Sequence, residues 1–307
     1  MTLGPSGQEK LALAAMTLSA AIWGSGFIVT RVAIDAGFGT GWILFGRFMV
    51  TTVFFALLFL RDLLRMTRRA FGAGLLAGIL LFFGFMFQTF GLARTTPARN
   101  AFITATYVVI VPLLGWLLTR RRPSGKVFAG ALLSLAGIAL LSWGAGGEGG
   151  SLAGDLLTFL CAVSFAAHFI VLEWAVRRAK ASQLLFLQMA VTTVLSSFML
   201  LSDPAGTAAL PVAGSADWTR GLLALAYLAV FSSGVAYAIQ TIAQKHTASS
   251  RAAIVLAAEA LWGSLFSVLF RFEPLTWRLA AGGLLIFVSI LLASYVRAPE
   301  ATVQPEK

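Results

Sequence analysis

The sequence predicts an all-α integral membrane protein with ten transmembrane helices in two inverted five-helix repeats. Of its 307 residues, 59% are apolar and only 11% are charged, whereas a soluble chain is about half apolar and about a quarter charged. The apolar residues form ten long blocks with short polar connections. Segments of the first half also recur in the second half in the same order, such as FIVTRVAI at 27–34 and FIVLEWAV at 169–176.

Each apolar block is long enough, or nearly so, to cross about 30 Å of hydrocarbon as an α-helix. The first block continues far beyond the length of a signal peptide and has only Lys10 as a basic flank, so we interpret it as a helix. The blocks cover residues 11–34, 42–60, 71–93, 101–119, 127–143, 156–176, 184–201, 222–243, 252–270 and 279–296.

The basic residues lie in alternate connections between the blocks. The net charge is +11, which on a soluble chain would suggest a nucleic-acid partner. Here the cations follow the second, fourth and sixth blocks, at Arg61, Arg65, Arg68, Arg69, Arg120, Arg121, Arg122, Lys126, Arg177, Arg178 and Lys180. Cytoplasmic loops carry such an excess of Lys and Arg. The pattern predicts a multi-pass protein of the bacterial inner membrane, with lipid and not nucleic acid around it and both termini in the cytoplasm.

Two polar segments have corresponding places in the two halves. Residues 88–99 read QTFGLARTTPAR and residues 240–251 read QTIAQKHTASSR, at a spacing of 152. Gln88 and Gln240 each end an apolar block and are expected to face a cavity, because polar groups in lipid are costly. Five helices per half place the second half upside down in the membrane. We expect a first repeat at 1–143, a Gly-rich linker at 144–154 and a second repeat at 155–307.

The same polar segments contain signals for helix breaks. Thr96 followed by Pro97 is typical of an N-cap and the first helical position, and Ser249 is expected to cap a later helix in the same way. Two interpretations stay open for these residues, namely hinges of a moving device and ordinary turns between helices. Pro112 lies inside an apolar block, where proline frees a backbone carbonyl, and we expect it to kink the helix beside a cavity.

Three ionisable residues lie at membrane depth. A carboxyl at the depth of Glu259 must be protonated, paired or next to water. We interpret it as a proton-exchanging group or the partner of an amine, and the alternative is a structural hydrogen bond between helices. His168 is a second candidate because histidine titrates near neutral pH, with packing as the alternative. Arg47 is either functional or snorkels to the membrane surface.

Four aromatic residues lie away from the expected headgroup zones, unlike the aromatic belt at membrane interfaces. Rings beside a cavity bind apolar or cationic groups, and the alternative is packing against lipid or the core. The candidates are Trp23, Tyr107, Tyr237 and Trp262. Together with the two glutamines, the histidine and the glutamate described above, they form the predicted cavity.

The stretches RNAFITATYVVIVPLLGWLL (99–118) and GDLLTFLCAVSFAAHFIVL (154–172) resemble the EamA-type transporters of the drug/metabolite transporter superfamily. The similarity runs across almost the whole chain and includes WGSGFI at 23–28, Arg47 and both Gln-Thr pairs. It departs from the family pattern at Ala260, where proline often follows the glutamate. The resemblance implies ten helices in two inverted repeats and proton-linked or exchange export of small metabolites, often amino acids.

The resulting hypothesis is a secondary active transporter that exports small organic metabolites across the inner membrane by alternating access, with protons as possible coupling ions. A cation-type multidrug exporter is the nearest alternative, and the single clear deep carboxyl disfavours it. An intramembrane enzyme is the alternative from a different class, for which one cysteine and two histidines offer little. P-loop, HExxH and GxSxG motifs are absent, and GAGGEG at 144–149 lacks a βαβ context, so we expect no cofactor and no metal.

Overall fold

The computed structural model describes residues 5–95, 97–120, 122–142, 151–202, 209–211, 216–269 and 275–294. Within these ranges the secondary structure consists of α-helices and one π-helix. Seven helices there are long and apolar enough to cross a membrane, and two shorter apolar helices cover Gly125–Leu140 and Ala280–Leu292. The all-α part of the predicted fold is confirmed, and the chain is a multi-pass membrane protein.

Some of the predicted blocks form one helix, whereas others form two or three consecutive ones. The block at 101–119 is divided once, the block at 222–243 contains a π-helical middle, and the block at 252–270 is divided once. The helices are α1 (Pro5–Asp35), α2 (Thr40–Leu63), α3 (Arg68–Leu92), α4 (Pro97–Ala105), α5 (Tyr107–Thr119), α6 (Gly125–Ser142), α7 (Leu152–Ala175), α8 (Ala181–Ser202), α9 (Ala216–Tyr227), η1 (Leu228–Val235), α10 (Ala236–Ala243), α11 (Ser249–Leu256), α12 (Glu259–Leu269) and α13 (Trp277–Ser294).

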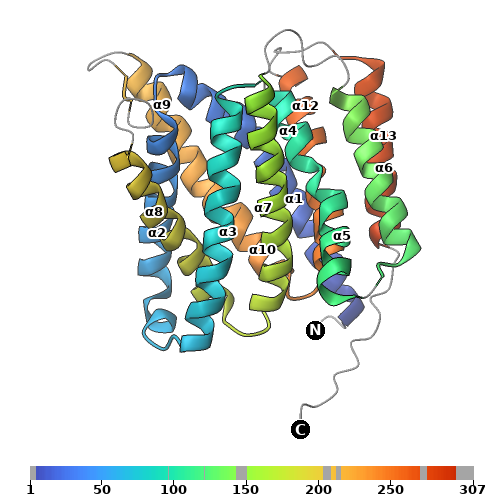
Figure 1. Ribbon diagram of the computed structural model, residues 1–307, viewed down its shortest axis with the longest axis horizontal. Coiled ribbons are helices and arrows are strands. Elements are labelled where there is room, and N and C mark those ends of the chain that lie inside the picture. The colour runs from blue at the N-terminus through green and yellow to red at the C-terminus, as the bar shows by residue number, and fades with distance from the viewer. Residues whose placement is uncertain are drawn as a thin grey trace.

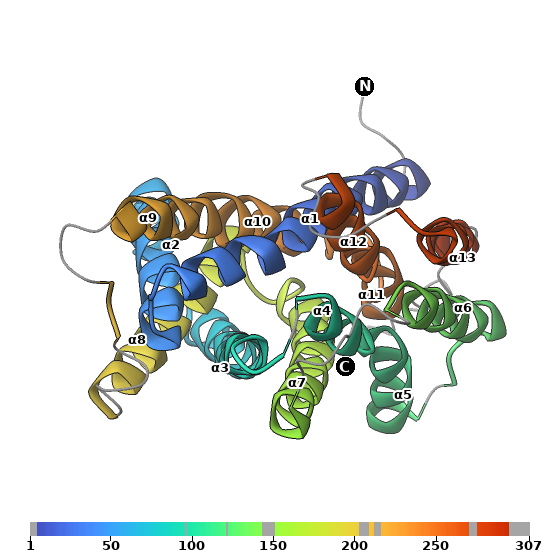
Figure 2. The same cartoon turned by 90° about the horizontal axis from the view of Figure 1, so that it is seen from above.

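Most of the helices run roughly along one common direction (Figure 1). Seen from above, α6 and α13 pair at one end of the molecule, and α2, α8 and α9 gather at the other (Figure 2). Between these groups, α1 packs on α10 and α12, and α3 packs on α7 and α8. The largest buried apolar cluster, which includes Phe48, Phe85, Phe169 and Ile254, joins helices from both halves of the chain.

The connections alternate between the two ends of the bundle. The α2–α3 and α7–α8 connections lie at the lower end in Figure 1, where the Lys180 ammonium is 2.6 Å from a carboxylate oxygen of Asp62. The α1–α2 and α3–α4 connections lie at the upper end. The α2–α3 and α7–α8 connections contain many of the basic residues, such as Arg65 and Arg178. These cations therefore collect at the lower end of the protein.

Two of the membrane-depth helices are interrupted at corresponding positions. Thr106 separates α4 from α5, and the Ala257–Ala258 pair separates α11 from α12. At both places the backbone forms tight i to i−3 hydrogen bonds, such as Thr106 N–H to the Ile103 carbonyl and Ala258 N–H to the Val255 carbonyl. Positions 106 and 258 are 152 residues apart, the same spacing as Gln88 and Gln240.

The structure changes some of the predicted helix breaks. α4 begins at Pro97 as expected, while Thr96 lies outside the described residues, as does most of the predicted linker. Pro112 is buried inside α5, and the interruption lies six residues before it, at Thr106, whose hydroxyl bonds back to the Ile103 carbonyl. Ser249 is not the N-cap of α11.

Ala248 occupies the N-cap position of α11 and provides no side-chain cap. Ser249 is instead the first helical residue, and its backbone N–H donates to a Glu173 carboxylate oxygen at 2.8 Å. A carboxylate near a helix N-terminus satisfies an otherwise unpaired donor and interacts favourably with the helix dipole. A side chain from α7 thus replaces the local cap that the sequence predicts.

Gly24 allows α1 to pack directly on the first turn of α12. A Cβ at this position would stand 2.7 Å from the Glu259 carbonyl oxygen, the Gly263 nitrogen and the Trp262 Cβ. Small residues at such crossings let two helix backbones approach closely. The close contact holds the start of α12, and with it Glu259, against the middle of α1.

Candidate functional site

A cavity with about 580 Å³ of empty space, part of it open to solvent, lies among helices from both halves of the chain. It is bounded by α1, α2, α3, α5, α7, η1, α10 and α12. The residues that line it are Trp23, Gly26, Phe27, Thr30, Arg47, Phe85, Gln88, Thr89, Leu92, Tyr107, Phe165, His168, Phe169, Ser232, Tyr237, Gln240 and Glu259.

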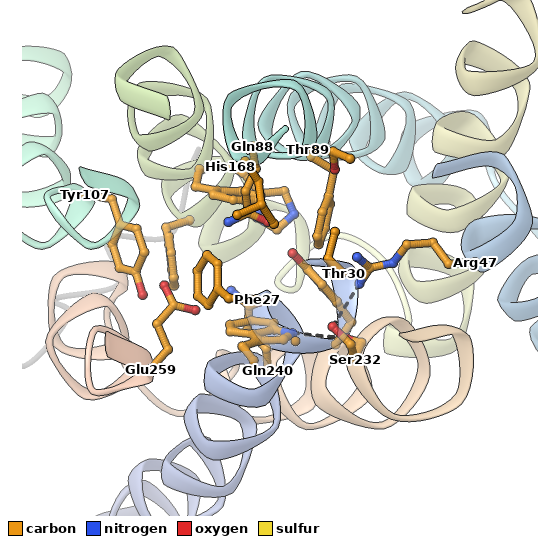
Figure 3. Close-up of a pocket in the computed structure, with 17 residues that line it drawn as sticks. Phe27, Thr30, Arg47, Gln88, Thr89, Tyr107, His168, Ser232, Gln240 and Glu259 are labelled. Carbon is orange, nitrogen blue, oxygen red and sulfur yellow. Dashed lines mark hydrogen bonds between the residues drawn. The ribbon is translucent and has the colours of Figure 1, made fainter. Parts of the chain in front are cut away.

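One side of the cavity carries Tyr107 and Glu259. Each is the first residue of a helix that follows an interruption, so the two breaks direct both side chains inward. The Tyr107 ring lies beside the Glu259 carboxyl (Figure 3). Glu259 is 5% exposed and forms no ion pair within the described residues. The buried Tyr107 hydroxyl has no hydrogen-bond partner of normal geometry there.

The other side of the cavity carries Arg47, whose side chain points inward from α2 (Figure 3). Its Nε donates to the Ser233 hydroxyl at 2.9 Å and its Nη2 donates to the Ser232 hydroxyl at 2.8 Å. The guanidinium carbon lies 4.5 Å from the centre of the Phe85 ring. Arg47 is 2% exposed, so the snorkelling interpretation does not apply.

Aromatic rings form the walls between these two sides. The Trp23 ring centre lies 4.9 Å from that of Tyr237, and the Phe85 ring centre lies 5.3 Å from that of Phe165. The Trp23 indole N–H donates to the Ser232 carbonyl at 3.0 Å, which fixes the orientation of the ring. The walls therefore offer apolar and π surface, while the polar groups stand at a few fixed places.

His168 and the two glutamines add polar groups to the cavity lining. His168 Nε2 is 2.6 Å from Gln188 Oε1 and forms a hydrogen bond with it, so this histidine both lines the cavity and has a partner. Gln240 is 1% exposed, and its side-chain oxygen has no hydrogen-bond partner within the described residues. A buried polar atom without a partner is costly unless water or a ligand satisfies it.

Of the residues predicted to form the cavity, all except Trp262 line it. Trp262 stacks on Phe266 with a ring-centre distance of 6.0 Å, and its Cβ lies against Gly24 of α1. The Trp262 side chain therefore packs at the close contact between α1 and α12 and does not line the cavity. The sequence alone does not reveal such a contact because it depends on how two distant helices cross.

Sequence reasoning missed the contribution of η1. Ser232 lines the cavity and, with Ser233, holds Arg47 in place. The adjacent hydroxyls in the middle of the apolar block at 222–243 were the available signal, since polar groups at membrane depth need partners. The π-helical turn itself has no such signal in the sequence, and π-helical segments occur frequently at functional sites.

An ion pair lies near each end of the cavity-forming helices. Arg99 pairs with Asp155 at the start of α7, and Arg251 pairs with Glu9 near the start of α1. Both distances are 2.5 Å. The two arginines are 152 residues apart and occupy the first turns of α4 and α11. The bundle is thus cross-linked by corresponding contacts at its two ends.

Comparisons with known proteins agree with this architecture. A transporter from Archaeoglobus fulgidus that is described as uncharacterized is 32% identical over 296 residues, covering 95% of this chain and 88% of the relative. A solved crystal structure that is 19% identical has a TM-score of 0.75, covering 92% of this chain and 96% of that one, and it shows the same fold. The sequence also matches the EamA-like transporter family over residues 10–143 and again over residues 152–295. The chain belongs to the EamA-like transporter family.

Proposed function

We propose that the protein is a secondary active transporter that moves small organic metabolites, such as amino acids, outward across the cell membrane. The observation that carries this proposal is the cavity, where Glu259 and Arg47 face a shared aromatic-lined space. Buried polar atoms without partners within the described residues, such as the Gln240 side-chain oxygen, are suited to contact a bound polar molecule. The family membership supports a transported small molecule.

We further propose that ten spans form two inverted repeats. The family matches the chain twice, at 10–143 and 152–295, and the interruptions at Thr106 and Ala258 have the spacing of the Gln-Thr pairs. The pairs α2–α8 and α6–α13 each join one helix from either half. Inverted repeats allow the same cavity to open alternately to the two sides of a membrane.

Transport into proteoliposomes tests this function. The purified protein would be reconstituted and supplied with a panel of amino acids and other small metabolites, with and without a pH gradient. Saturable flux that depends on the protein is expected for at least one compound of the panel. Flux no greater than in protein-free vesicles for every compound would contradict the proposal.

The cavity does not favour the cation-type multidrug exporter. Among the described residues that line the cavity, Glu259 is the only one with a carboxyl group, and the buried guanidinium of Arg47 shares the same space. A dication would meet one carboxyl and one unpaired positive charge in a medium of low dielectric constant, where like charges repel strongly. A substrate with at most one cationic group fits these charges better.

We propose that the Arg99–Asp155 and Arg251–Glu9 ion pairs hold the two ends of the bundle closed, and that each breaks when the cavity opens at its own end. Replacing Arg251 with glutamine should weaken closure at the end of the bundle where α1 begins, because Glu9 then loses the charge that it faces. In a protein without Cys161, a cysteine at the buried position Thr247 should react faster with a thiol reagent when Arg251→Gln is present. The double exchange Glu9→Arg and Arg251→Glu should slow the labelling of this cysteine again. An unchanged labelling rate in Arg251→Gln would contradict the proposal that this ion pair holds the end closed.

We propose that the lower end in Figure 1, with its excess of Arg and Lys, faces the cytoplasm. In a protein without Cys161, an impermeant thiol reagent on intact cells should label a cysteine at Ala93 and spare one at Ser124. Both side chains are exposed, and they lie in connections at opposite ends of the bundle. Permeabilised cells provide the control, since both positions should then react. Labelling at 124 with protection at 93 would reverse the orientation.

A further inference from the structure

We propose that Arg47 is an anion-binding subsite that receives the carboxylate of the transported molecule. This inference rests on the proposed transport function and assigns the chemical class of one end of the substrate. It begins with the position of the guanidinium, which is buried and lies on the cavity wall (Figure 3).

The first argument is the absence of an opposite charge beside Arg47. Within the described residues no carboxylate forms an ion pair with it, and Glu259 lies across the cavity next to Tyr107. Charged groups inside a membrane are rare and usually pair with one another or line a substrate pathway. Arg47 lines the cavity without such a pair, so the neutralising charge is expected to come from a ligand.

The second argument is the number of hydrogen-bond donors. A guanidinium has five N–H groups in a planar fork that matches a carboxylate. Ser233 accepts from Nε and Ser232 accepts from Nη2, and three N–H groups therefore remain for other partners. The serine hydroxyls hold the fork in place, but as neutral groups they leave its charge uncompensated.

The third argument is the rigidity of the surroundings. The Thr51 hydroxyl lies 2.8 Å from both the Arg47 and the Ala229 carbonyl oxygens, which share its one hydrogen, and so it ties α2 to η1 one turn from the guanidinium. The Phe48 and Phe85 rings lie 5.1 and 4.5 Å from the guanidinium carbon. A cation held between fixed hydroxyls and rings is preorganised, and a preorganised site loses less conformational entropy on binding.

The other residues that line the cavity indicate the chemistry of the rest of the ligand. Trp23, Phe27 and Tyr237 line the same cavity as Arg47 and offer an apolar surface for the body of a ligand. A second anionic group on the ligand would face Glu259, the lining carboxylate across the cavity. The geometry therefore favours a monocarboxylate with an apolar or aromatic body, and an amine on the same molecule is compatible with Glu259.

Matched ligands separate the carboxylate from the amine. The probes are L-phenylalanine, L-phenylalaninamide, which lacks the carboxylate, and 3-phenylpropionate, which lacks the amine. Binding to the purified protein would be measured by thermal stabilisation and by competition with any amino-acid flux found in proteoliposomes. The parent is expected to bind the two carboxylates about tenfold or more tightly than the amide, given the strength of a charge-assisted bidentate contact.

Variants at Arg47 connect this preference to one side chain. Arg47→Gln should lose the preference for carboxylates, and Arg47→Lys should keep part of it, because lysine keeps the charge but not the fork. Arg61→Gln is the matched control, since it removes the same charge from an exposed position near the end of the same helix. This control should behave like the parent.

Several results would overturn the anion subsite. Equal binding of phenylalanine and its amide by the parent would do so, and this comparison needs no variant to fold. An undiminished preference in Arg47→Gln, or no stabilisation of the parent by either carboxylate, would do so as well. Saturable transport of compounds without a carboxylate, unaffected in a folded Arg47→Gln protein, would reject the subsite and leave the transport function intact. A lack of flux for the whole metabolite panel would instead contradict the transport function.

Discussion

Replacing Glu259 with glutamine is expected to abolish transport driven by a pH gradient while leaving membrane insertion and folding intact. Glu259 is buried on the cavity wall, forms no ion pair within the described residues, and begins α12 directly after a helix interruption. A carboxyl group can carry a proton in one state and a charge in another, whereas glutamine is close in shape and cannot exchange a proton. The side chain is therefore suited to couple proton movement to substrate movement.

Two flux measurements separate the possible roles of Glu259. If the carboxyl carries the coupling proton, exchange of substrate without a gradient should survive in Glu259→Gln. If it binds a substrate amine, exchange should fail as well, and substrate binding should weaken. Asp35→Asn is a suitable control because Asp35 is a half-exposed carboxylate paired with Arg31 at the end of α1. Parent-like flux in both assays, or flux that falls only with the amount of folded protein, would return Glu259 to a structural role.

Gly24→Ala is expected to destabilise the protein by about 1–3 kcal/mol, the usual cost of overpacking a tight contact. The new Cβ would stand 2.7 Å from backbone atoms of Glu259 and Gly263, which cannot move aside as a flexible side chain can. α1 and α12 would have to separate, and the displacement would reach the cavity through Glu259. We therefore expect a lower thermal unfolding temperature in detergent together with a loss of flux.

Gly72→Ala provides the matched control for this substitution. Gly72 lies in α3, and a Cβ added there meets no atom within 4 Å. Alanine also favours helix over glycine by about 1 kcal/mol, so the control should be as stable as the parent or slightly more stable. If Gly24→Ala matches this control in both stability and flux, the close contact is not important.

The pattern of apolar blocks was sufficient to predict where the helices lie, because each span must satisfy its backbone hydrogen bonds within lipid. It was less informative about where spans are interrupted. Pro112 has the stronger local signal, yet the break occurs at Thr106, where a hydroxyl and tight i to i−3 bonds end α4. The corresponding break at Ala257–Ala258 lies in a run of alanines, which by themselves favour an unbroken helix.

Some cavity residues could likewise be predicted from the sequence, whereas others could be assigned only from the structure. Glu259, Gln88 and Gln240 could be selected from the sequence because polar side chains at membrane depth are costly and need a reason. Trp262 was also selected because of its depth in the membrane. In the structure, however, its side chain packs at the contact between α1 and α12 and against Phe266. Arg47 was open to two interpretations, and the serines of η1 exclude snorkelling because they hold its side chain inside the cavity.

The sequence by itself determined that the chain is a helical membrane protein related to the EamA-like transporters, because hydropathy and repeated motifs are local properties of the chain. Only the tertiary structure decided which polar residues meet. Arg47 and Ser232 are 185 residues apart, and Tyr107 and Glu259 face each other from different halves of the chain. Such contacts depend on where helices cross and where they are interrupted. Both features arise from the packing of distant segments and leave no periodic pattern in the sequence of either segment.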